Sequence, residues 1–290
     1  MVRGAALVRH VAFAIPGDLQ AATGGYGYDR RMARELRELG WQVDVVELGD
    51  GFPQPSATQR AFAMDRLRAL PEGRTILIDG LAFGVLPELR AALSGRHALI
   101  ALVHHPLALE SGLPANAARV LHASEKAALA TASGIVVTSP QTARDLAGQY
   151  DVPESRIAIC RPGTDRVRQQ RTAGGAVVRL LSVGSVVPRK GHDVLVEALA
   201  GLTGLPWHLT IVGDRNRDAA TARALDALIA HHGLEQRIAV TGELPEAAVH
   251  AAYAKADLFV LASHHEGYGM VFAEAIAHEL PVIGTTAGAI

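Results

Sequence analysis

Residues 257–286 read DLFVLASHHEGYGMVFAEAIAHELPVIGTT and contain an apolar strand, a glycine-rich loop, a helical segment and a second apolar strand. Helical periodicity covers residues 270–279, and Pro281 ends the helix because proline cannot continue it. A helix that follows one strand and precedes another is the usual connection between parallel strands. This stretch therefore predicts part of a parallel α/β sheet.

The same alternation runs through the rest of the chain. Further apolar strand candidates lie at 10–16, 42–48, 74–80, 97–105, 134–140, 156–163, 177–184, 208–214 and 237–243. Helical patterns separate them, which is typical of a parallel sheet covered on both faces. We predict an α/β protein with two doubly wound, Rossmann-like domains, 1–165 and 177–290, joined by a polar linker at 166–176. Ligands of such sheets bind beyond the carboxyl ends of the strands, and we expect a central cleft between the domains.

Composition excludes several classes of protein. The net charge of −1 provides no attraction to nucleic acid or to an anionic membrane. The single cysteine, Cys160, excludes an internal disulfide framework and suits a reducing compartment. Arg9 and His10 interrupt the first apolar stretch and no small-residue cleavage site follows it, so we expect no signal peptide. No apolar run of about 18 residues is present in the sequence, so we predict no integral membrane segment. We expect a cytoplasmic protein, and a peripheral position on the inner membrane face stays open.

The first glycine-rich segment is TGGYGYDRR at 23–31, which follows the first strand and opens the first helix. Gly24, Gly25 and Gly27 allow a ligand to approach the backbone, and a helix N-terminus favours an anion. The segment is similar to a dinucleotide-binding fingerprint, but Arg30 occupies the place of the third glycine. A tight structural turn is the alternative interpretation.

Histidines are the next candidates. His104 and His105 end the fourth strand, and since adjacent strand residues face opposite sides, only one of them can enter a given cleft. The alternative is one solvated and one core histidine. Other histidine pairs, at 231–232 and 264–265, cannot readily chelate one ion from regular structure, and no Asp-x-Asp occurs in the sequence. We predict no metal.

Two cations stand at the start of the first helix of the second domain. Arg189 and Lys190 directly precede Gly191. Cations beside a helix N-terminus suit phosphate oxygens through both charge and backbone donors. A solvated basic loop is the alternative.

The final segment combines acceptors and donors. Gly267 and Gly269 allow the loop to fold over a ligand, with Glu266 on its rim and Glu274 one turn into the next helix. Carboxylates accept hydrogen bonds from vicinal hydroxyls, while the helix N-terminus suits a diphosphate. This combination predicts a nucleotide-sugar site.

The Glu266-x7-Glu274 pattern resembles the signature of the retaining family-4 glycosyltransferases, which have the GT-B fold. Residues 24–48, 136–146, 152–165, 182–199, 209–214 and 252–269 resemble the same family, in family order. The resemblance implies a metal-independent hexosyltransferase without a cofactor, whose donor is a UDP- or GDP-linked sugar. The acceptor stays open between a glycan, a lipid and a small metabolite. By the same resemblance the first domain receives the acceptor and the second binds the donor.

The resemblance also implies roles for residues. Glu274 would bind the donor ribose, Glu266 the transferred sugar, and Lys190 the diphosphate. His104 would lie near the reacting sugar, so His104, Glu266 and Lys190 are the catalytic candidates. The remaining donor contacts would come from the amides of Gly269, Met270 and Val271, from Arg189 and Gly267, and from Gly24 and Gly25 in a loop that closes over the phosphates.

Two features depart from the family pattern. Ser185 stands where the family usually has an arginine, and Arg189 is the candidate to replace that charge. The family continues beyond the strand at 281–286, so we expect this chain to be C-terminally truncated and to self-associate through the uncovered edge. Two alternatives to a transferase remain: a non-catalytic nucleotide-sugar binder or inactive partner subunit and, more distantly, an NAD-dependent oxidoreductase.

Overall fold

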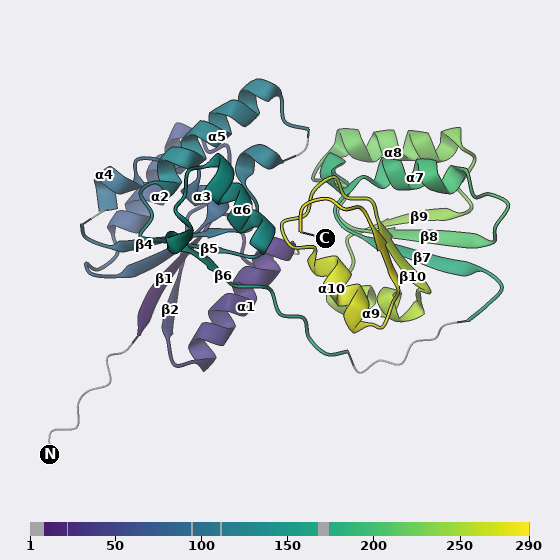
Figure 1. Cartoon of the computed structure of the whole chain (residues 1–290), viewed down its shortest axis with the longest axis horizontal. Coiled ribbons are helices and arrows are strands. Elements are labelled where there is room, and N and C mark those ends of the chain that lie inside the picture. The colour runs from purple at the N-terminus through teal and green to yellow at the C-terminus, as the bar shows by residue number, and fades with distance from the viewer. Residues whose placement is uncertain (1–8, 22, 94, 111, 168–173, 290) are drawn as a thin grey trace, which may run out of the picture. The chain divides into compact units, whose positions relative to one another are not determined.

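The structure is a computed structural model that describes residues 9–21, 23–93, 95–110, 112–167 and 174–289. The chain divides into two compact units, Met1–Pro162 and Gly163–Ile290, each with its own sheet (Figure 1). Part of the predicted linker at 166–176, residues 168–173, lies outside the described residues.

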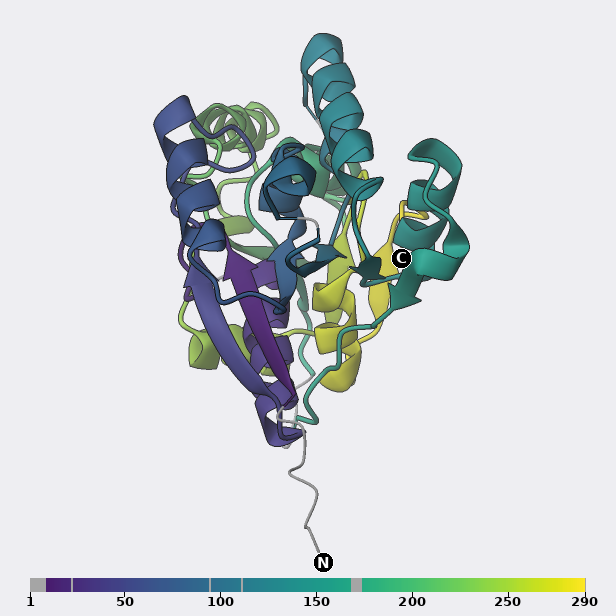
Figure 2. The same cartoon turned by 90° about the vertical axis from the view of Figure 1, so that its left-hand side faces the viewer.

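The first unit contains a six-stranded parallel sheet in the order β2-β1-β3-β4-β5-β6. Figure 2 shows β1 and β2 side by side at one edge. Because β1 is flanked by β2 and β3, the winding of the chain reverses there, and the carboxyl ends of β1 and β3 form a topological switch point. The strands are β1 (His10–Ile15), β2 (Gln42–Glu47), β3 (Thr75–Asp79), β4 (Ala98–Val103), β5 (Gly134–Val137) and β6 (Ile157–Ile159).

Helices cover both faces of this sheet. One face packs on a core that includes Ile78, Phe83, Leu86 and Leu129, and α1 lies on the other face (Figure 1). In α2 and α5 a stripe of mainly apolar side chains explains this packing, with Met64 and Leu67 buried in α2 and Leu121 and Leu129 in α5. The helices are α1 (Gly24–Glu38), α2 (Ala57–Arg68), α3 (Gly80–Phe83), α4 (Leu89–Leu93), α5 (Ala115–Leu129) and α6 (Pro140–Gln149), with single 3₁₀ turns η1 (Leu107–Leu109) and η2 (Glu154–Arg156).

The second unit contains a five-stranded parallel sheet in the order β11-β10-β7-β8-β9. Its winding reverses between β7 and β10, so the loops that follow these two strands face each other at one edge. The strands are β7 (Val178–Val183), β8 (Trp207–Val212), β9 (Ile238–Gly242), β10 (Leu258–Leu261) and β11 (Val282–Gly284).

In the second unit α7 and α8 lie on one face of the sheet, and α9 and α10 lie on the other (Figure 1). Trp207 and Ile229 belong to the core on the first face, and Tyr253, Phe259 and Phe272 belong to the core on the second. The helices are α7 (His192–Ala200), α8 (Ala219–His231), α9 (Glu246–Lys255) and α10 (Met270–Ala277), with a 3₁₀ turn η3 (Pro188–Lys190).

The prediction of two doubly wound α/β domains is confirmed, and each predicted strand corresponds to a strand of one of the two sheets. The last strand, β11, pairs with β10 at the sheet edge, and Ile283 within it is 59% exposed. Within the described ranges, no helix combines the length and the apolar character needed to cross a membrane.

Candidate functional site

The loops after β7 and β10 are joined by backbone contacts. Arg189 accepts a hydrogen bond from the His264 amide at 2.8 Å through its carbonyl, and its Nη1 donates to the His265 carbonyl at 3.0 Å. Gly191 has φ of +59°, and a Cβ there would lie 2.0 Å from the carbonyl oxygen of Ala262. Only glycine permits this approach. The basic turn η3 is therefore held against the loop that carries Glu266.

Lys190 and Glu266 form a buried ion pair. The Nζ atom of Lys190 lies 2.7 Å from Oε1 of Glu266, and the Ser263 hydroxyl donates to the same oxygen at 2.6 Å. Arg189 Nη1 lies 3.6 Å from Oε2 of Glu266, which is only 6% exposed. Burial raises the pKa of Glu266, but the charge and hydrogen bond of Lys190 outweigh it and hold that pKa below the ordinary value. Glu266 is thus an ionised carboxylate close to two cations.

The loop after β11 completes the surroundings of Glu266. The amide of Ala289 donates to the Glu266 carbonyl at 2.9 Å, and the hydroxyl of Thr285 donates to the Ser263 carbonyl. Gly288 has φ of +72°, and a Cβ there would lie 2.3 Å from the Glu266 carbonyl oxygen. Loops from three parallel strands therefore fix the position of this glutamate.

The N-terminus of α10 opens beside these residues. Gly269 is the N-cap residue with φ of 83°, and no side chain caps the helix. The first amides of a helix have no partner within it and carry partial positive charge. Met270 and Val271 are the first two residues of α10, so their amides lie in this first turn, and Gly267 lies in the preceding loop. Their role as donors to a phosphate stays a prediction.

Glu274 lies one turn further into α10. Its Oε2 accepts a hydrogen bond from the Tyr253 hydroxyl at 2.9 Å. Burial raises the pKa of Glu274, and the hydrogen bond from Tyr253 and the charges of His250 and Lys190 act in the opposite direction. The predicted donor-site residues of the second unit thus gather at the carboxyl edge of one sheet: Arg189, Lys190, Glu266, Gly267, Gly269, Met270, Val271 and Glu274.

His104 lies at the corresponding edge of the first unit, directly after β4. Its Nε2 is 2.9 Å from Oδ1 of Asp29 on α1 and 3.5 Å from Oδ2 of Asp79 at the end of β3. Both aspartates are buried, at 0% and 1% exposed. Burial by itself lowers the pKa of His104, but the two carboxylates outweigh it and raise that pKa above the ordinary value. The arrangement favours an imidazolium ring whose Nε2 proton points at the carboxylates.

Gly24 and Gly25 are the first two residues of α1 rather than members of a loop, because Thr23 caps the helix by accepting a hydrogen bond from the Tyr26 amide. This agrees with the expectation that the segment opens the first helix, and the donor role of both glycines stays a prediction. A Cβ at Gly25 would lie 3.6 Å from Cδ2 of His104, so the helix start packs directly on the histidine.

Arg30, at the place of the third fingerprint glycine, has a structural role. Its Nη1 donates to the carbonyl oxygens of Leu19 at 2.6 Å and Ala21 at 3.0 Å. The guanidinium thereby holds the loop before α1, where a dinucleotide site requires a small residue. This observation disfavours the oxidoreductase alternative.

The Asp29, Asp79 and His104 cluster is also where a metal ion could bind in the described part of the chain. One ligand atom from each residue lies within 4.8 Å of the others. The members of this group come from three separate elements, so no short sequence motif such as Asp-x-Asp contains them. The absence of a metal stays a prediction.

The loop after His104 is anchored by a further buried carboxylate, that of Glu125. Oε2 of Glu125, on α5, accepts a hydrogen bond from the Leu107 amide at 2.9 Å. Glu125 is 1% exposed, and burial raises its pKa to about 7. This glutamate therefore titrates close to neutral pH in the folded protein.

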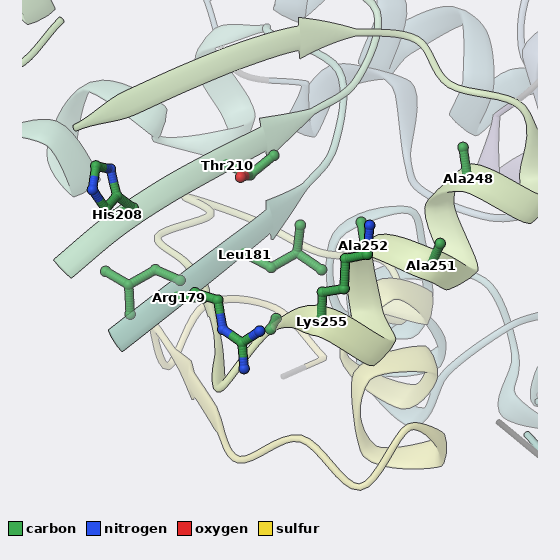
Figure 3. Close-up of a pocket in the computed structure, with 10 residues that line it drawn as sticks. Arg179, Leu181, His208, Thr210, Ala248, Ala251, Ala252 and Lys255 are labelled. Carbon is green, nitrogen blue, oxygen red and sulfur yellow. The ribbon is translucent and has the colours of Figure 1, made fainter. Parts of the chain in front are cut away.

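A separate cavity of about 410 Å³ lies on the second sheet. Figure 3 shows Arg179 and His208 from β7 and β8 on one side and Ala251 and Lys255 from α9 on the other. Arg179 and His208 are near the amino ends of their strands, at the edge opposite the loops that carry Lys190 and Glu266. This cavity is therefore not the candidate site.

Sequence reasoning missed four residues of the two clusters: Asp29, Asp79, Tyr253 and Ser263. Asp79 did carry a signal, since it is a carboxylate at the carboxyl end of the apolar strand TILID. Asp29 and Tyr253 lie on helices, and nothing in their spacing distinguishes them from other helical residues.

Two family models and several curated proteins match the chain. The family model Glycosyltransferase Family 4 matches residues 28–168, and the model Glycosyl transferases group 1 matches residues 164–290. The chain is 30% identical over 207 residues to the D-inositol 3-phosphate glycosyltransferase of Nocardia farcinica, which covers 66% of this chain and 45% of that protein. It is 29% identical over 174 residues to the mannosylfructose-phosphate synthase of Agrobacterium fabrum, covering 53% and 38%. The chain thus spans about half the length, or less, of these curated relatives.

Solved structures show the fold. Sucrose-phosphate synthase from Thermosynechococcus elongatus matches with a TM-score of 0.79 at 21% identity, over 97% of this chain and 82% of that one. WaaG, a glycosyltransferase involved in lipopolysaccharide biosynthesis, matches with a TM-score of 0.72 at 20% identity, over 96% and 82%. Anabaena HepE in complex with UDP and glucose matches with a TM-score of 0.71 at 18% identity, over 96% and 81%. The two domains of the chain have the GT-B fold.

Proposed function

We propose that this chain, built as a GT-B glycosyltransferase, transfers a hexose from a UDP- or GDP-linked donor to an acceptor hydroxyl with retained anomeric configuration. One observation carries the proposal: the Lys190–Glu266 pair and the N-terminus of α10, with Glu274 one turn into that helix, lie at the carboxyl edge of one sheet. These groups match the parts of a nucleotide-sugar, namely a diphosphate between two sets of hydroxyls.

Each group has a role that follows from its chemistry. Lys190 and the amides of Met270 and Val271 would stabilise negative charge on the diphosphate, which grows as the bond to the sugar breaks. Glu274 would accept hydrogen bonds from the ribose hydroxyls, and Glu266 from the hydroxyls of the transferred sugar. No metal is needed for these roles, since the chain supplies its own cations next to a helix N-terminus.

In the reaction one bond forms, one bond breaks and one proton moves. The acceptor oxygen bonds to the anomeric carbon, the bond from that carbon to the diphosphate oxygen breaks, and the acceptor proton passes to the departing phosphate on the same face. Glu266 would orient the sugar rather than attack it, because Lys190 and Ser263 already engage its Oε1. His104, in the acceptor-side domain, is the remaining catalytic candidate.

A non-catalytic nucleotide-sugar binder is the second candidate. Two observations favour it: Ser185 replaces an expected arginine, and Glu266 already neutralises the charge of Lys190. Such a protein would bind donors but would not break the bond to the sugar.

A panel of radiolabelled UDP- and GDP-hexoses separates the two. A transferase releases nucleoside diphosphate and labelled sugar, to water or to an added acceptor, and NMR of the product reports retention. Saturable donor binding with no release beyond that of a Lys190→Met/Glu266→Gln variant identifies a binder. The absence of both binding and release would refute the proposed function.

A further inference from the structure

A buried tyrosine contacts the glutamate assigned to the ribose. Tyr253, on α9, is 1% exposed, and its hydroxyl lies 2.9 Å from Oε2 of Glu274 and 3.2 Å from the carbonyl oxygen of Val271. A phenol has a single proton to donate, and an ionised carboxylate at the shorter distance is the stronger acceptor. The proton is therefore shared chiefly with Glu274.

The ring of Tyr253 stacks with two other rings. It stacks on His278, with ring centroids 4.9 Å apart and an interplanar angle of 17°, and on Phe259 at 6.0 Å. His278 is itself held, because its Nε2 lies 3.0 Å from Nδ1 of His250. The hydroxyl of Tyr253 is thus a donor at a fixed point in the second core.

Glu274 needs such a donor. Its long side chain loses about 1.5–2 kcal/mol of rotamer entropy when it is held in one position, and that cost weakens ligand binding unless the free protein has already met it. The hydrogen bond from Tyr253 uses Oε2, so Oε1 is the carboxylate oxygen that remains for hydroxyls of a ligand.

We propose that Tyr253 is a positioning residue that holds Glu274 for the ribose hydroxyls of the donor, and so sets the preference for ribonucleotides over their deoxy counterparts. The inference rests on the proposed function, since it assigns Glu274 to the ribose. The preference for ribonucleotides would then depend on the Tyr253 hydroxyl, which acts on the ligand only through Glu274.

The test measures this preference by calorimetry with UDP, GDP and their 2′,3′-dideoxy forms. The native chain should bind one ribonucleotide more tightly than its dideoxy form, and Glu274→Gln should remove most of that difference. Tyr253→Phe should weaken ribonucleotide binding by roughly 3- to 10-fold, the scale of one hydrogen bond, while leaving dideoxynucleotide binding unchanged. A double variant should bind no more weakly than Glu274→Gln alone, because both changes act through one carboxylate.

Two controls separate positioning from a general loss of stability. Tyr150→Phe removes a hydroxyl from a tyrosine of the first unit that is 2% exposed, and it should leave the preference intact. Replacement of Tyr253 by 4-aminophenylalanine keeps an N–H donor at that place and should retain the preference. The second variant also provides the test if Tyr253→Phe does not fold, since a protein that keeps the donor and loses the preference contradicts the inference.

The outcomes distinguish the positioning role of Tyr253 from the assignment of Glu274 to the ribose. If Glu274→Gln abolishes the preference and Tyr253→Phe retains it, Tyr253 does not position the glutamate, and the proposed function stands. If the native chain binds UDP and GDP no better than their dideoxy forms, the ribose assignment fails and the inference fails with it. If Tyr253→Phe weakens all nucleotides equally, its role is structural and the inference is wrong.

Discussion

Substitution of Lys190 by methionine removes the positive charge of the Lys190–Glu266 pair while keeping an unbranched side chain at that position. Methionine keeps an unbranched apolar chain but leaves Glu266, 6% exposed, with the Ser263 hydroxyl and with Arg189 at 3.6 Å. Removing one partner of a buried ion pair costs about 3–5 kcal/mol when the other charge stays uncompensated. The cost has a ceiling here, because Glu266 can take up a proton instead.

The ceiling follows from the ordinary pKa of the carboxyl, 4.5. At pH 7 neutralising such a group costs about 3 kcal/mol, and at pH 5 it costs less than about 1 kcal/mol. We therefore expect Lys190→Met to lower the free energy of unfolding by about 2–3 kcal/mol at pH 7, which is roughly 10 °C in Tm for a unit of this size. In the native chain the folded pKa of Glu266 is depressed, so its stabilisation is present above 4.5 and is lost as the pH falls through the folded pKa. In the variant burial raises that pKa, so the two chains should differ less at pH 5.

Thermal melting at pH 7 and pH 5 checks this reasoning, with the double variant Lys190→Met/Glu266→Gln as the decisive comparison. The amide removes the buried charge, so the double variant should recover most of the lost stability while still failing to bind nucleoside diphosphates. Lys255→Met, on an exposed position of α9, is the matched control and should melt like the native chain. A single variant as stable as the native chain, or a double variant no more stable than the single one, would refute the argument.

Three further predictions concern metal dependence, pH dependence and association. Sugar release should persist in excess chelator; activity that is lost and then restored by Mg²⁺ or Mn²⁺ would contradict this and would direct attention to Asp29, Asp79 and His104. Burial raises the pKa of Glu125 from 4.5 to about 7, so the folded state keeps a proton that the unfolded chain releases, and stability is lost as the pH rises between these values. Glu125→Gln should remove about 3 kcal/mol of that pH dependence. If the free energies of unfolding of the native chain and of the variant fall in parallel across pH 4.5–7, this prediction is wrong. Ile283, 59% exposed on the edge strand β11, should promote self-association that Ile283→Lys reduces in light scattering, and a native chain that stays monomeric at every concentration would count against this.

The fold could be predicted from the sequence because buried apolar residues recur at short, regular intervals along each strand and helix. Apolar runs such as RTILIDG alternate with helical patterns, and this period by itself indicates parallel strands covered by helices on both faces. The edge that carries the site was readable for the same reason. Parallel strands end at one edge, so residues that follow different strands, such as Lys190 after β7 and Glu266 after β10, must lie near each other if those strands are neighbours.

Whether those strands are neighbours was decided only by the tertiary structure. Strand order sets the partners of each side chain: Lys190 and Glu266 are 76 residues apart in the chain, and Asp29 and His104 are 75 apart. Local periodicity carries no information about such distances, since it reports which face of an element is buried but not what covers it.

Three features of the candidate site have their cause in that packing: the neutralised charge of Lys190, the two carboxylates around His104, and the hydroxyl of Tyr253 on Glu274. Each depends on a close approach that only the folded chain creates, as at Gly191, where a Cβ would overlap the carbonyl oxygen of Ala262. The pattern of apolar and polar residues alone thus specifies the architecture and the residue types at the edge of each sheet. The pairing of those residues, and with it their charge and orientation, was decided by the order of the strands and the contacts between their loops.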